Sequence, residues 1–573
     1  MESLRQEIEQ SLKSVFAHLG IPESPWLKML SESRERAQGD YSLPCFPIAK
    51  ALGQNPIELA QSIAEKIDSS VEAKAVNGYL NFKSTPEWLF SHLFSSSKVK
   101  IDHQVLIEHT SANPNGPFHV GRARNAILGD TLVRLHRLHG HDVRAEYYVD
   151  DMGKQVAALA WGLENLSQDE VEQILGDVEP IPEIWSQKSD HLRVRCYQAV
   201  QRLRANKNER AAKIEQEIGS MVHASEEGDE EVLHRFEQAY QPVLDGMLET
   251  LARLGVHFDA FTKESRFVVD GTVERLMDEM SSLPIHGEAD NGAHFLDLGQ
   301  RGLKGKTEFF YRRGDGSSLY ATRDVAYHLW KFGQCEHLIN VLGEDHRLQA
   351  KQVGLTLQEF GQTPPDIVFY AFIKLPEGKM STRKGNVVFM DDLLEEAQSH
   401  AYVVVKELRP ELDEVNLQKI AEAVGVSAVR FNIIRVSPEK GFTFKWEDAL
   451  SFEGNSAPFI MYSHTRACSI AKKISEKPSL SNLPPQPENA AIDLMRTLAW
   501  FDERLSRSVQ ESKPQLFAGY LLELASAYNG FYRDCSVMRD GNVDAFHFHL
   551  SEKARMNLKS GMEALGIVAL EEM

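Results

Sequence analysis

Hydrophobic and polar positions follow two periods along the chain, and each period predicts its own kind of element. The aliphatic run "VLIE" within 104–110 is short and ends in polar residues, which is typical of a buried parallel strand. After it, 127–138 carries apolar residues at spacings of three and four, which predicts a helix that Gly140 ends. Further strands are expected at 142–151, 336–346 and 365–375. Strands alternating with helices predict an open, parallel α/β sheet.

The first 95 residues predict a smaller α+β unit. In "GQNPIELAQSIAEKI", Asn55 is a suitable N-cap and Pro56 suits the first turn of a helix. The run "AVNGYLNFK" at 75–83 then predicts a strand, and "SSSKVK" at 95–100 a linker.

The whole pattern predicts an α/β protein with three domains. An N-terminal α+β domain is expected at 1–98, and a Rossmann-like domain on a parallel sheet at 99–405. The polar stretch 165–300 predicts a helical, acidic insertion in the second domain. A C-terminal all-α helical bundle is expected at 406–573.

Charge changes this picture little. The 573 residues carry a net charge of −20, which taken alone argues against a nucleic-acid partner. However, residues 164–300 hold 28 acidic against 13 basic residues, so most of the excess negative charge lies in the insertion. The rest of the chain can still present basic patches.

The cysteines and the hydrophobic runs bear on location. Five cysteines lie far apart with no CxxC spacing, which predicts a reducing cytoplasm, no disulfide framework and no cysteine-based zinc site. No apolar run approaches the length of a membrane span. The first 20 residues predict an amphipathic helix and do not have the pattern of a signal peptide.

The stretch "NPNGPFHVGRARNAILGD" at 113–130 is the first candidate for chemistry. It places a Pro- and Gly-rich turn between a strand and a helix, which is how an α/β sheet brings a helix N-terminus to an anionic ligand. The same residues also suit a plain strand-to-helix turn with a packing histidine.

The second candidate is "GKMSTRKGNVVFMDDLL" at 378–394. Lysines, hydroxyl groups and glycines in a loop after a strand suit a clamp that neutralises polyphosphate. A basic surface loop is the alternative.

Together the two stretches resemble the "HIGH" and "KMSKS" signatures of class I aminoacyl-tRNA synthetases. They stand here as "HVGR" and "KMSTRKG", and the displaced lysine of the second is similar to the arginyl-tRNA synthetases. Matches to that family continue in "EYYVDDMGKQ", "SLYATRDVAYH" and "PFIMYSHTRACSI". The resemblance runs nearly from end to end, and it implies ATP-dependent ligation of L-arginine to tRNA through an arginyl-adenylate.

The resemblance also implies an ATP site. Catalytic roles fall on His119, Lys384, Lys379 and Arg122, and ATP contacts on Asn113, Pro114, Gly116, His119, Gly121, Arg122, Met380, Ser381 and Lys384. Arg122 stands where the family usually has a second histidine, and an arginine can still donate to a phosphate oxygen. ATP is expected with Mg²⁺, and no structural metal is expected.

A guanidinium substrate needs carboxylates in a planar arrangement. The family likeness points to Glu108, Asn113, Tyr320, Asp324 and Asp345 for arginine. Tyr320 and Asp324 are four residues apart and hence neighbours if they lie on a helix. A role as a cap or as a salt-bridge partner is the alternative for Glu108, and a polar turn is the alternative for Asp345 and the following His346.

The C-terminal region resembles the family's anticodon-binding bundle. Tyr462, His464 and Arg466 offer stacking and cationic groups suited to unpaired bases, although Tyr462 also suits helix packing. Partners implied are tRNA, arginine and ATP, with no membrane, and the chain is expected to be a monomer. Two other functions stay open: a synthetase for another amino acid, and a catalytically silent tRNA-binding paralogue.

Overall fold

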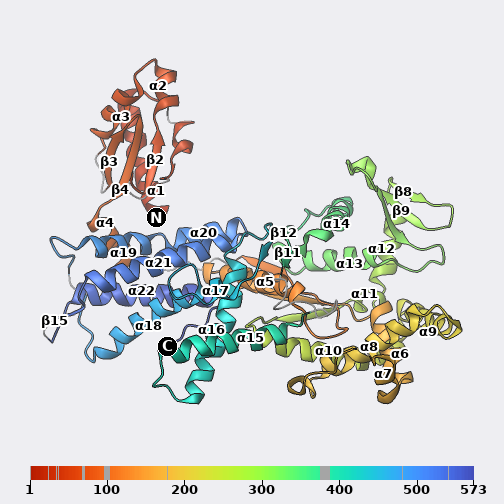
Figure 1. Cartoon of the computed structure of the whole chain (residues 1–573). Coiled ribbons are helices and arrows are strands. Elements are labelled where there is room, and N and C mark those ends of the chain that lie inside the picture. The colour runs from red at the N-terminus through yellow and green to blue at the C-terminus, as the bar shows by residue number, and fades with distance from the viewer. Residues whose placement is uncertain are drawn as a thin grey trace.

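The computed structural model describes residues 2–22, 25–33, 35, 38–67, 71–95, 103–176, 178–374, 388–480, 482–539 and 541–573. Three parts are visible in Figure 1: a small N-terminal unit, a central sheet with its helices, and a long C-terminal bundle. In the described part of the chain, no helix is both long and apolar enough to cross a membrane.

The N-terminal unit is a four-stranded antiparallel sheet, in the order β1-β2-β4-β3, with helices packed against it. Asn55 caps a helix as predicted, since its side chain accepts from the backbone N–H of Ile57. The elements are α1 (Glu2–Leu19), β1 (Ser31–Glu32), β2 (Tyr41–Pro44), α2 (Phe46–Leu52), α3 (Pro56–Ala64), β3 (Val71–Val76), β4 (Tyr79–Ser84) and α4 (Pro86–Phe94).

The single strand predicted at 75–83 is wrong, because the chain forms a hairpin there. Asn77 and Gly78 have φ of 49° and 81°, and they turn β3 back onto β4. Two successive left-handed residues cannot lie in a strand, and Asn-Gly is the pair that a two-residue hairpin turn favours. This signal was readable in the sequence.

The central sheet has five parallel strands in the order β12-β11-β5-β6-β7. The chain runs outward from β5 to β6 and β7, then returns to the other side of β5 with β11 and β12. Ligands of open α/β sheets bind where this direction changes, at the carboxyl ends of the strands. The elements are β5 (Gln104–Glu108), α5 (Val120–His139), β6 (Asp142–Val149), β7 (Ala260–Lys263), α13 (Tyr320–Phe332), β11 (His337–Gly343), α14 (Arg347–Glu359) and β12 (Asp366–Tyr370).

The described part of the predicted helical insertion at 165–300 consists of helices and loops as far as Arg253, and beyond Arg253 it contains both helices and strands. There, β7 belongs to the parallel sheet, while β8 and β9 pair with β10 in a separate antiparallel sheet. The helices are α6 (Lys154–Asn165), α7 (Gln168–Ile174), α8 (Ser189–Ala205), α9 (Glu209–Glu226) and α10 (Glu230–Arg253). They are followed by α11 (Arg266–Val269), α12 (Thr272–Ser281), β8 (His286–Glu288), β9 (His294–Asp297) and β10 (Glu308–Arg312).

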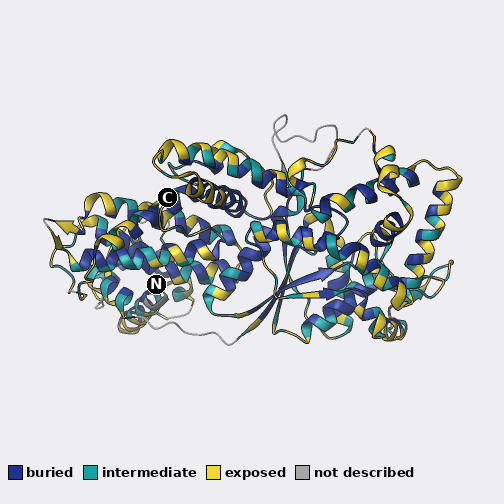
Figure 2. Cartoon of the chain, turned by 90° about the horizontal axis from the view of Figure 1, so that it is seen from below, coloured by how far each residue is buried: buried dark blue, intermediate teal, exposed yellow. Residues whose placement is uncertain are grey.

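The remainder is helical, as predicted from about residue 410, and it begins earlier with α15. Its helices lie side by side in the blue half of Figure 1 and bury their apolar faces against one another (Figure 2). They are α15 (Met390–Leu408), α16 (Glu414–Ile434), α17 (Trp446–Ala449), α18 (Ala457–Lys473), α19 (Asn489–Ala499), α20 (Phe501–Gln510), α21 (Pro514–Asp534) and α22 (Ala545–Ala564). Short pairs are β13 (Ile373–Lys374) with β14 (Phe442–Thr443), and β15 (Met538–Arg539) with β16 (Asn542–Val543).

Helix α5 joins the sheet to the bundle through buried charges. Arg430 of α16 is fully buried, lies 2.6 Å from Asp130 of α5, and also donates to the carbonyl of Leu254 at 2.9 Å. Burial alone would raise the pKa of Asp130, but Arg430 and Arg134 hold it below its ordinary value. Removing one member of such a pair would leave a buried charge unmatched, so these contacts restrict where α5 can lie. The predicted fold class is confirmed.

Candidate active site

The turn before α5 is joined by main-chain hydrogen bonds to the segment that follows the second signature. His119 is the N-cap of α5 and makes no side-chain cap bond. The N–H of Val120 donates to the carbonyl of Val388 at 3.0 Å, and the N–H of Met390 donates to that of Phe118 at 2.7 Å. The predicted phosphate residues Lys379, Met380, Ser381 and Lys384 lie outside the described residues. The residues that follow the second signature, 388–390, thus lie beside His119.

His119 is half-buried, and its surroundings keep it neutral. Burial first, and then the charge of Arg122, lower the pKa of His119 to about 4. A neutral imidazole offers one N–H donor. In the first turn of α5, the N–H of Val120 donates to the carbonyl of Val388, and the N–H of Arg122 donates to that of His119. A Cβ at Gly121 would lie 3.0 Å from Nδ1 of His119, so the glycine makes room for this ring. The predicted contact of Gly121 with ATP stays a prediction.

The loop between β5 and α5 is packed onto the insertion helices. A Cβ at Gly116 would lie 2.5 Å from Cγ2 of Val194 in α8, so this glycine permits close packing, and Pro114 is buried. The side chain of Asn113 donates to Oε1 of Gln155 at 3.1 Å, and Asn115 donates to the same oxygen at 2.8 Å. Gln155 of α6 therefore positions Asn113, and no sequence signal singled it out.

Glu108 lies at the carboxyl end of β5, and a cation already contacts it. Its Oε2 accepts from Nζ of the fully buried Lys331 at 2.6 Å, and its Oε1 accepts from Oγ of Ser111 at 3.0 Å. A carboxylate has about four acceptor sites. Glu108 can still accept from a ligand, but part of its charge is neutralised within the protein.

Asp324 and Tyr320 share the first turns of α13, so their predicted helical spacing is confirmed. Asp324 lies 3.1 Å from Nδ1 of His328 and accepts from Nε2 of Gln349 at 3.4 Å. Burial alone would raise the pKa of Asp324, but His328 and Lys331 bring it below its ordinary value. Asp324 is thus a carboxylate at neutral pH, with 21% of its side chain exposed.

More carboxylates gather here than the sequence indicated. Partial burial raises the pKa of the Tyr320 hydroxyl, and four carboxylates raise it further: Asp324, Glu264, Asp150 and Glu108. Glu264 is fully buried against Arg323, and burial also raises the pKa of Glu264 and of Asp150. Burial favours the protonated form of Glu264, and Lys331 offsets the charge of Glu108, so Asp324 and Asp150 carry most of the negative charge beside Tyr320, which suits a cationic ligand. Asp150 and Glu264 lie far apart in the chain, so only their place in the fold relates them.

Asp345 also lies at this edge, directly after β11. It belongs to a short 3-10 helix, Glu344–His346, and its side chain is exposed, 3.7 Å from His346. A Cβ at Gly343 would lie 2.3 Å from Oδ1 of Asp345, so the glycine lets this carboxylate fold back over the strand end. Its contact with arginine stays a prediction.

The three residues predicted to contact tRNA lie on α18, and one of those predictions is wrong. Tyr462 is 40% exposed, and the guanidinium of Arg466 lies over its ring at 4.3 Å and over that of Tyr532 at 5.1 Å. His464 is completely buried, and its Nδ1 lies 2.9 Å from the carbonyl of Leu570. Positions 462 and 464 lie on different faces of the helix, so His464 packs inside the bundle and cannot stack on a base.

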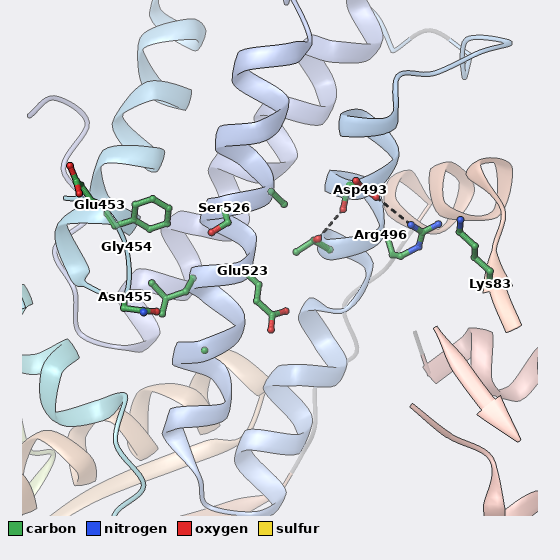
Figure 3. Close-up of a pocket in the computed structure, with 13 residues that line it drawn as sticks. Lys83, Glu453, Gly454, Asn455, Asp493, Arg496, Glu523 and Ser526 are labelled. Carbon is green, nitrogen blue, oxygen red and sulfur yellow. Dashed lines mark hydrogen bonds and ion pairs between the residues drawn. The ribbon is translucent and has the colours of Figure 1, made fainter. Parts of the chain in front are cut away.

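A hollow of about 1170 Å³ lies elsewhere, between the N-terminal unit and the bundle (Figure 3). None of its lining residues belongs to the His119 turn. Lys83 reaches it from β4, while Arg496 and Glu523 come from α19 and α21. Its mixture of acidic and basic groups gives no charge preference for ATP, so we do not assign the nucleotide to it.

Comparison with known proteins agrees with this geometry. A family model described as "tRNA synthetases class I (R), catalytic domain" matches residues 87–446. The models "Arginyl tRNA synthetase N terminal domain" and "DALR anticodon binding domain" match 2–84 and 460–573. The fold and the His119 turn thus define a class I aminoacyl-tRNA synthetase.

Relatives that match along nearly the whole chain identify the family within this class. The arginine–tRNA ligase of Methanocella arvoryzae is 41% identical over 551 residues, covering 94% of each chain, and that of Methanothermobacter thermautotrophicus is 38% identical over 588 residues. The arginyl-tRNA synthetase of Thermus thermophilus superposes with a TM-score of 0.80 at 25% identity, covering 100% of both chains. That of Plasmodium falciparum shares the fold, with a TM-score of 0.75 at 17% identity. The chain belongs to the arginyl-tRNA synthetase family.

Proposed function

We propose that this chain ligates L-arginine to its tRNA in two steps, with ATP as the energy source and an arginyl-adenylate as the intermediate. The observation that carries the proposal is the pairing of the His119 turn with the segment 388–390, beside the acidic edge around Tyr320 and Asp324. One half of this arrangement suits phosphate and the other half suits a guanidinium. The family membership of the whole chain supports the same reaction.

In the first step the carboxylate of arginine attacks the α-phosphate of ATP, and pyrophosphate leaves. The attacking group comes from the substrate, so the protein positions the reactants and stabilises charge. His119 would donate to a phosphate oxygen through its neutral imidazole, and the positive end of the α5 dipole would favour the negative charge of the phosphates. Arg122 would add a permanent charge, and Lys384 with Lys379 would neutralise the departing pyrophosphate. Mg²⁺ would enter with ATP, on its phosphate oxygens.

Arginine would bind on the acidic side of the site. Asp324 and Tyr320 would face the guanidinium, and Glu108 would add to the negative field with Lys331 moderating its charge. Asn113, held by Gln155, would orient the α-amino and carboxylate groups of the substrate. Asp345 lies at the same edge and would line the pocket from β11.

In the second step the terminal ribose hydroxyl of tRNA takes the arginyl group and AMP leaves. Tyr462 and Arg466 on the bundle at 406–573 would contact unpaired bases of the anticodon, by stacking and by charge. The unit at 1–98 would contact another part of the tRNA, and 99–405 would hold the chemistry. We further propose a monomer that works in the cytoplasm, and light scattering of the purified chain tests the first of these.

ATP–pyrophosphate exchange with each amino acid, run with and without tRNA, tests the function. Exchange that requires arginine, followed by transfer of labelled arginine to tRNA, is the expected result. Exchange with another amino acid in place of arginine would contradict the specificity. Tight tRNA binding with no exchange under either condition would indicate a silent paralogue.

A further inference from the structure

Three side chains that can bind a metal ion meet at the end of the bundle marked by β15 in Figure 1. Glu488 is the N-cap residue of α19, Cys535 directly follows α21, and His547 lies in the first turn of α22. A carboxylate oxygen, the Sγ and a ring nitrogen of these residues lie within 4.8 Å of one another. They belong neither to the His119 turn nor to the tRNA residues on α18.

Within the described ranges, a second trio has equally close donor atoms: Asp190, His191 and Asp391. That trio already holds a cation, because Nζ of Lys188 lies 2.6 Å from Asp391 and 3.2 Å from Asp190. We therefore interpret this trio as part of a structural ion-pair network. No lysine or arginine contact of this kind is found among the described neighbours of Glu488, Cys535 and His547.

The hydrogen bonds of His547 indicate a positively charged species beside its Nε2. Its Nδ1 lies 3.0 Å from the carbonyl of Ser536, so this nitrogen carries the proton and donates it. The other nitrogen, Nε2, then presents a lone pair, and it lies 3.1 Å from Oε2 of Glu488. A lone pair and a carboxylate repel each other at this distance, so either a second proton or a metal ion lies between them. A carbonyl that orients the far nitrogen is also the usual support of a metal-binding histidine.

Cys535 completes the group from the buried side. Only 3% of the residue is exposed, and its sulfur accepts a hydrogen bond from the backbone N–H of Ala491. The carboxylates of Glu488, Asp534 and Asp544 lie close enough to act on this sulfur electrostatically. The same carboxylates favour the approach of a divalent cation, and the Ala491 N–H would stabilise a thiolate.

We propose that Glu488, Cys535 and His547 form a zinc site that clips the starts of α19 and α22 to the end of α21. Sulfur, imidazole and carboxylate donors together favour Zn²⁺ over Mg²⁺ or Ca²⁺, which prefer oxygen. On binding, the S–H bond of Cys535 breaks and its proton passes to solvent. His547 binds through Nε2 and keeps its Nδ1 proton, Glu488 binds through one oxygen, and water takes the fourth position. Donors around tetrahedral zinc lie about 3.3–3.8 Å apart, and Nε2 of His547 and Oε2 of Glu488 already lie 3.1 Å apart.

The clip has a consequence for the tRNA-binding face. Tyr532 lies one turn before Cys535 on α21, and its ring packs under Arg466, which also covers Tyr462. A metal that holds the end of α21 would therefore stabilise the position of Tyr532 beneath Arg466. Because the ligands come from three separate helix ends, their spacing in the sequence resembles no known zinc motif. This explains why no structural metal is expected from sequence.

Metal binding by the full chain tests the proposal. The protein is stripped with a chelator, titrated with Zn²⁺ against a chromophoric competitor, and titrated in parallel with Co²⁺. One metal per chain and a thiolate-to-cobalt charge-transfer band are expected. Cys535→Ser should abolish the band, and Glu488→Gln should weaken zinc binding by about tenfold or more. Glu488 is exposed, so its substitution keeps the test valid if Cys535→Ser does not fold.

Cys468→Ser is the matched control. Cys468 is also a buried cysteine of the bundle, and its Sγ lies 3.6 Å from Nε2 of His464, but no carboxylate completes a trio there. This variant should bind zinc and cobalt like the parent. If the parent shows no charge-transfer band, or if Cys535→Ser binds zinc as tightly as the parent, the proposal is overturned. The cation beside His547 is then a proton, and Glu488 and His547 form a plain ion pair.

Discussion

Replacing Gly121 by alanine tests whether activation depends on the position of the His119 ring. In the structure, a Cβ at 121 would lie 3.0 Å from Nδ1 and 3.1 Å from Cε1 of His119. Carbon atoms in contact prefer separations of about 3.5–4.0 Å, so the ring would have to move by roughly half an ångström or rotate. The backbone of α5 can stay where it is, because the helix tolerates alanine at this position.

The expected effects on stability and on activity have opposite signs. Alanine is the better helix former, so the free energy of unfolding should rise by up to about 1 kcal/mol. A displacement of about 1 Å at a catalytic group can cost about a hundredfold in rate, so a shift of half that size should slow activation by roughly 10- to 100-fold. That corresponds to about 1.4–2.7 kcal/mol of barrier. His119→Ala sets the upper limit, at about 2–4 kcal/mol for the loss of one preorganised donor.

ATP–pyrophosphate exchange at saturating arginine measures the activation step, and urea unfolding measures the stability. Gly219→Ala in α9 is the control, because a Cβ there meets no atom within 4 Å. It should give a similar gain in stability with parent-like exchange. If Gly121→Ala keeps the parent rate while His119→Ala is slow, the glycine does not position the ring and the reasoning is refuted.

Three further predictions follow from the site and from its buried histidines. Lys384→Ala should slow pyrophosphate exchange by about 2–4 kcal/mol with little change in the KM for arginine, whereas Lys379→Ala should be milder; the reverse order would contradict the placement of the displaced lysine. Asp324→Asn should weaken arginine use by about 2–4 kcal/mol and leave ATP binding unchanged, measured by calorimetry, and a loss of ATP affinity alone would contradict the pocket. Burial lowers the pKa of His109 to about 4, so between its ordinary 6.5 and about 4 the unfolded chain takes up a proton that the native chain does not. The free energy of unfolding should therefore fall as pH falls through this window, by up to about 1.4 kcal/mol per pH unit from this residue, and His109→Gln should flatten the slope in urea unfolding curves.

Local patterns predicted several of the elements correctly, because the forces that form them act over a few residues. The run at 104–108 is strand β5, and Gly140 ends α5 in the left-handed conformation with φ of 108°. Asn55 caps α3 through its own side chain. The hairpin at Asn77 is also a local feature, and weighing its turn residues above the apolar run would have found it.

The site was partly predictable for a different reason. The turn around His119 is contiguous in the chain, so its order of residues indicates a phosphate-binding helix start without knowledge of the rest. The spacing of Tyr320 and Asp324 on one helix was equally local. The hydrogen-bond partners of these residues could not be predicted in this way. Lys331 beside Glu108, and Gln155 beside Asn113, come from other elements that only the folded sheet brings near.

By itself the sequence determined the strands β5, β6, β11 and β12, the helix that follows β5, the family, and the two segments that carry the chemistry. These depend on periodicity and on short contiguous motifs. Only the tertiary structure decided that His464 points into the bundle, that Asp150 and Glu264 join the acidic edge, and that Cys535 meets His547. Burial and the electrostatic field at a side chain depend on residues of other helices and strands, and no local pattern in the chain records which of those will become neighbours.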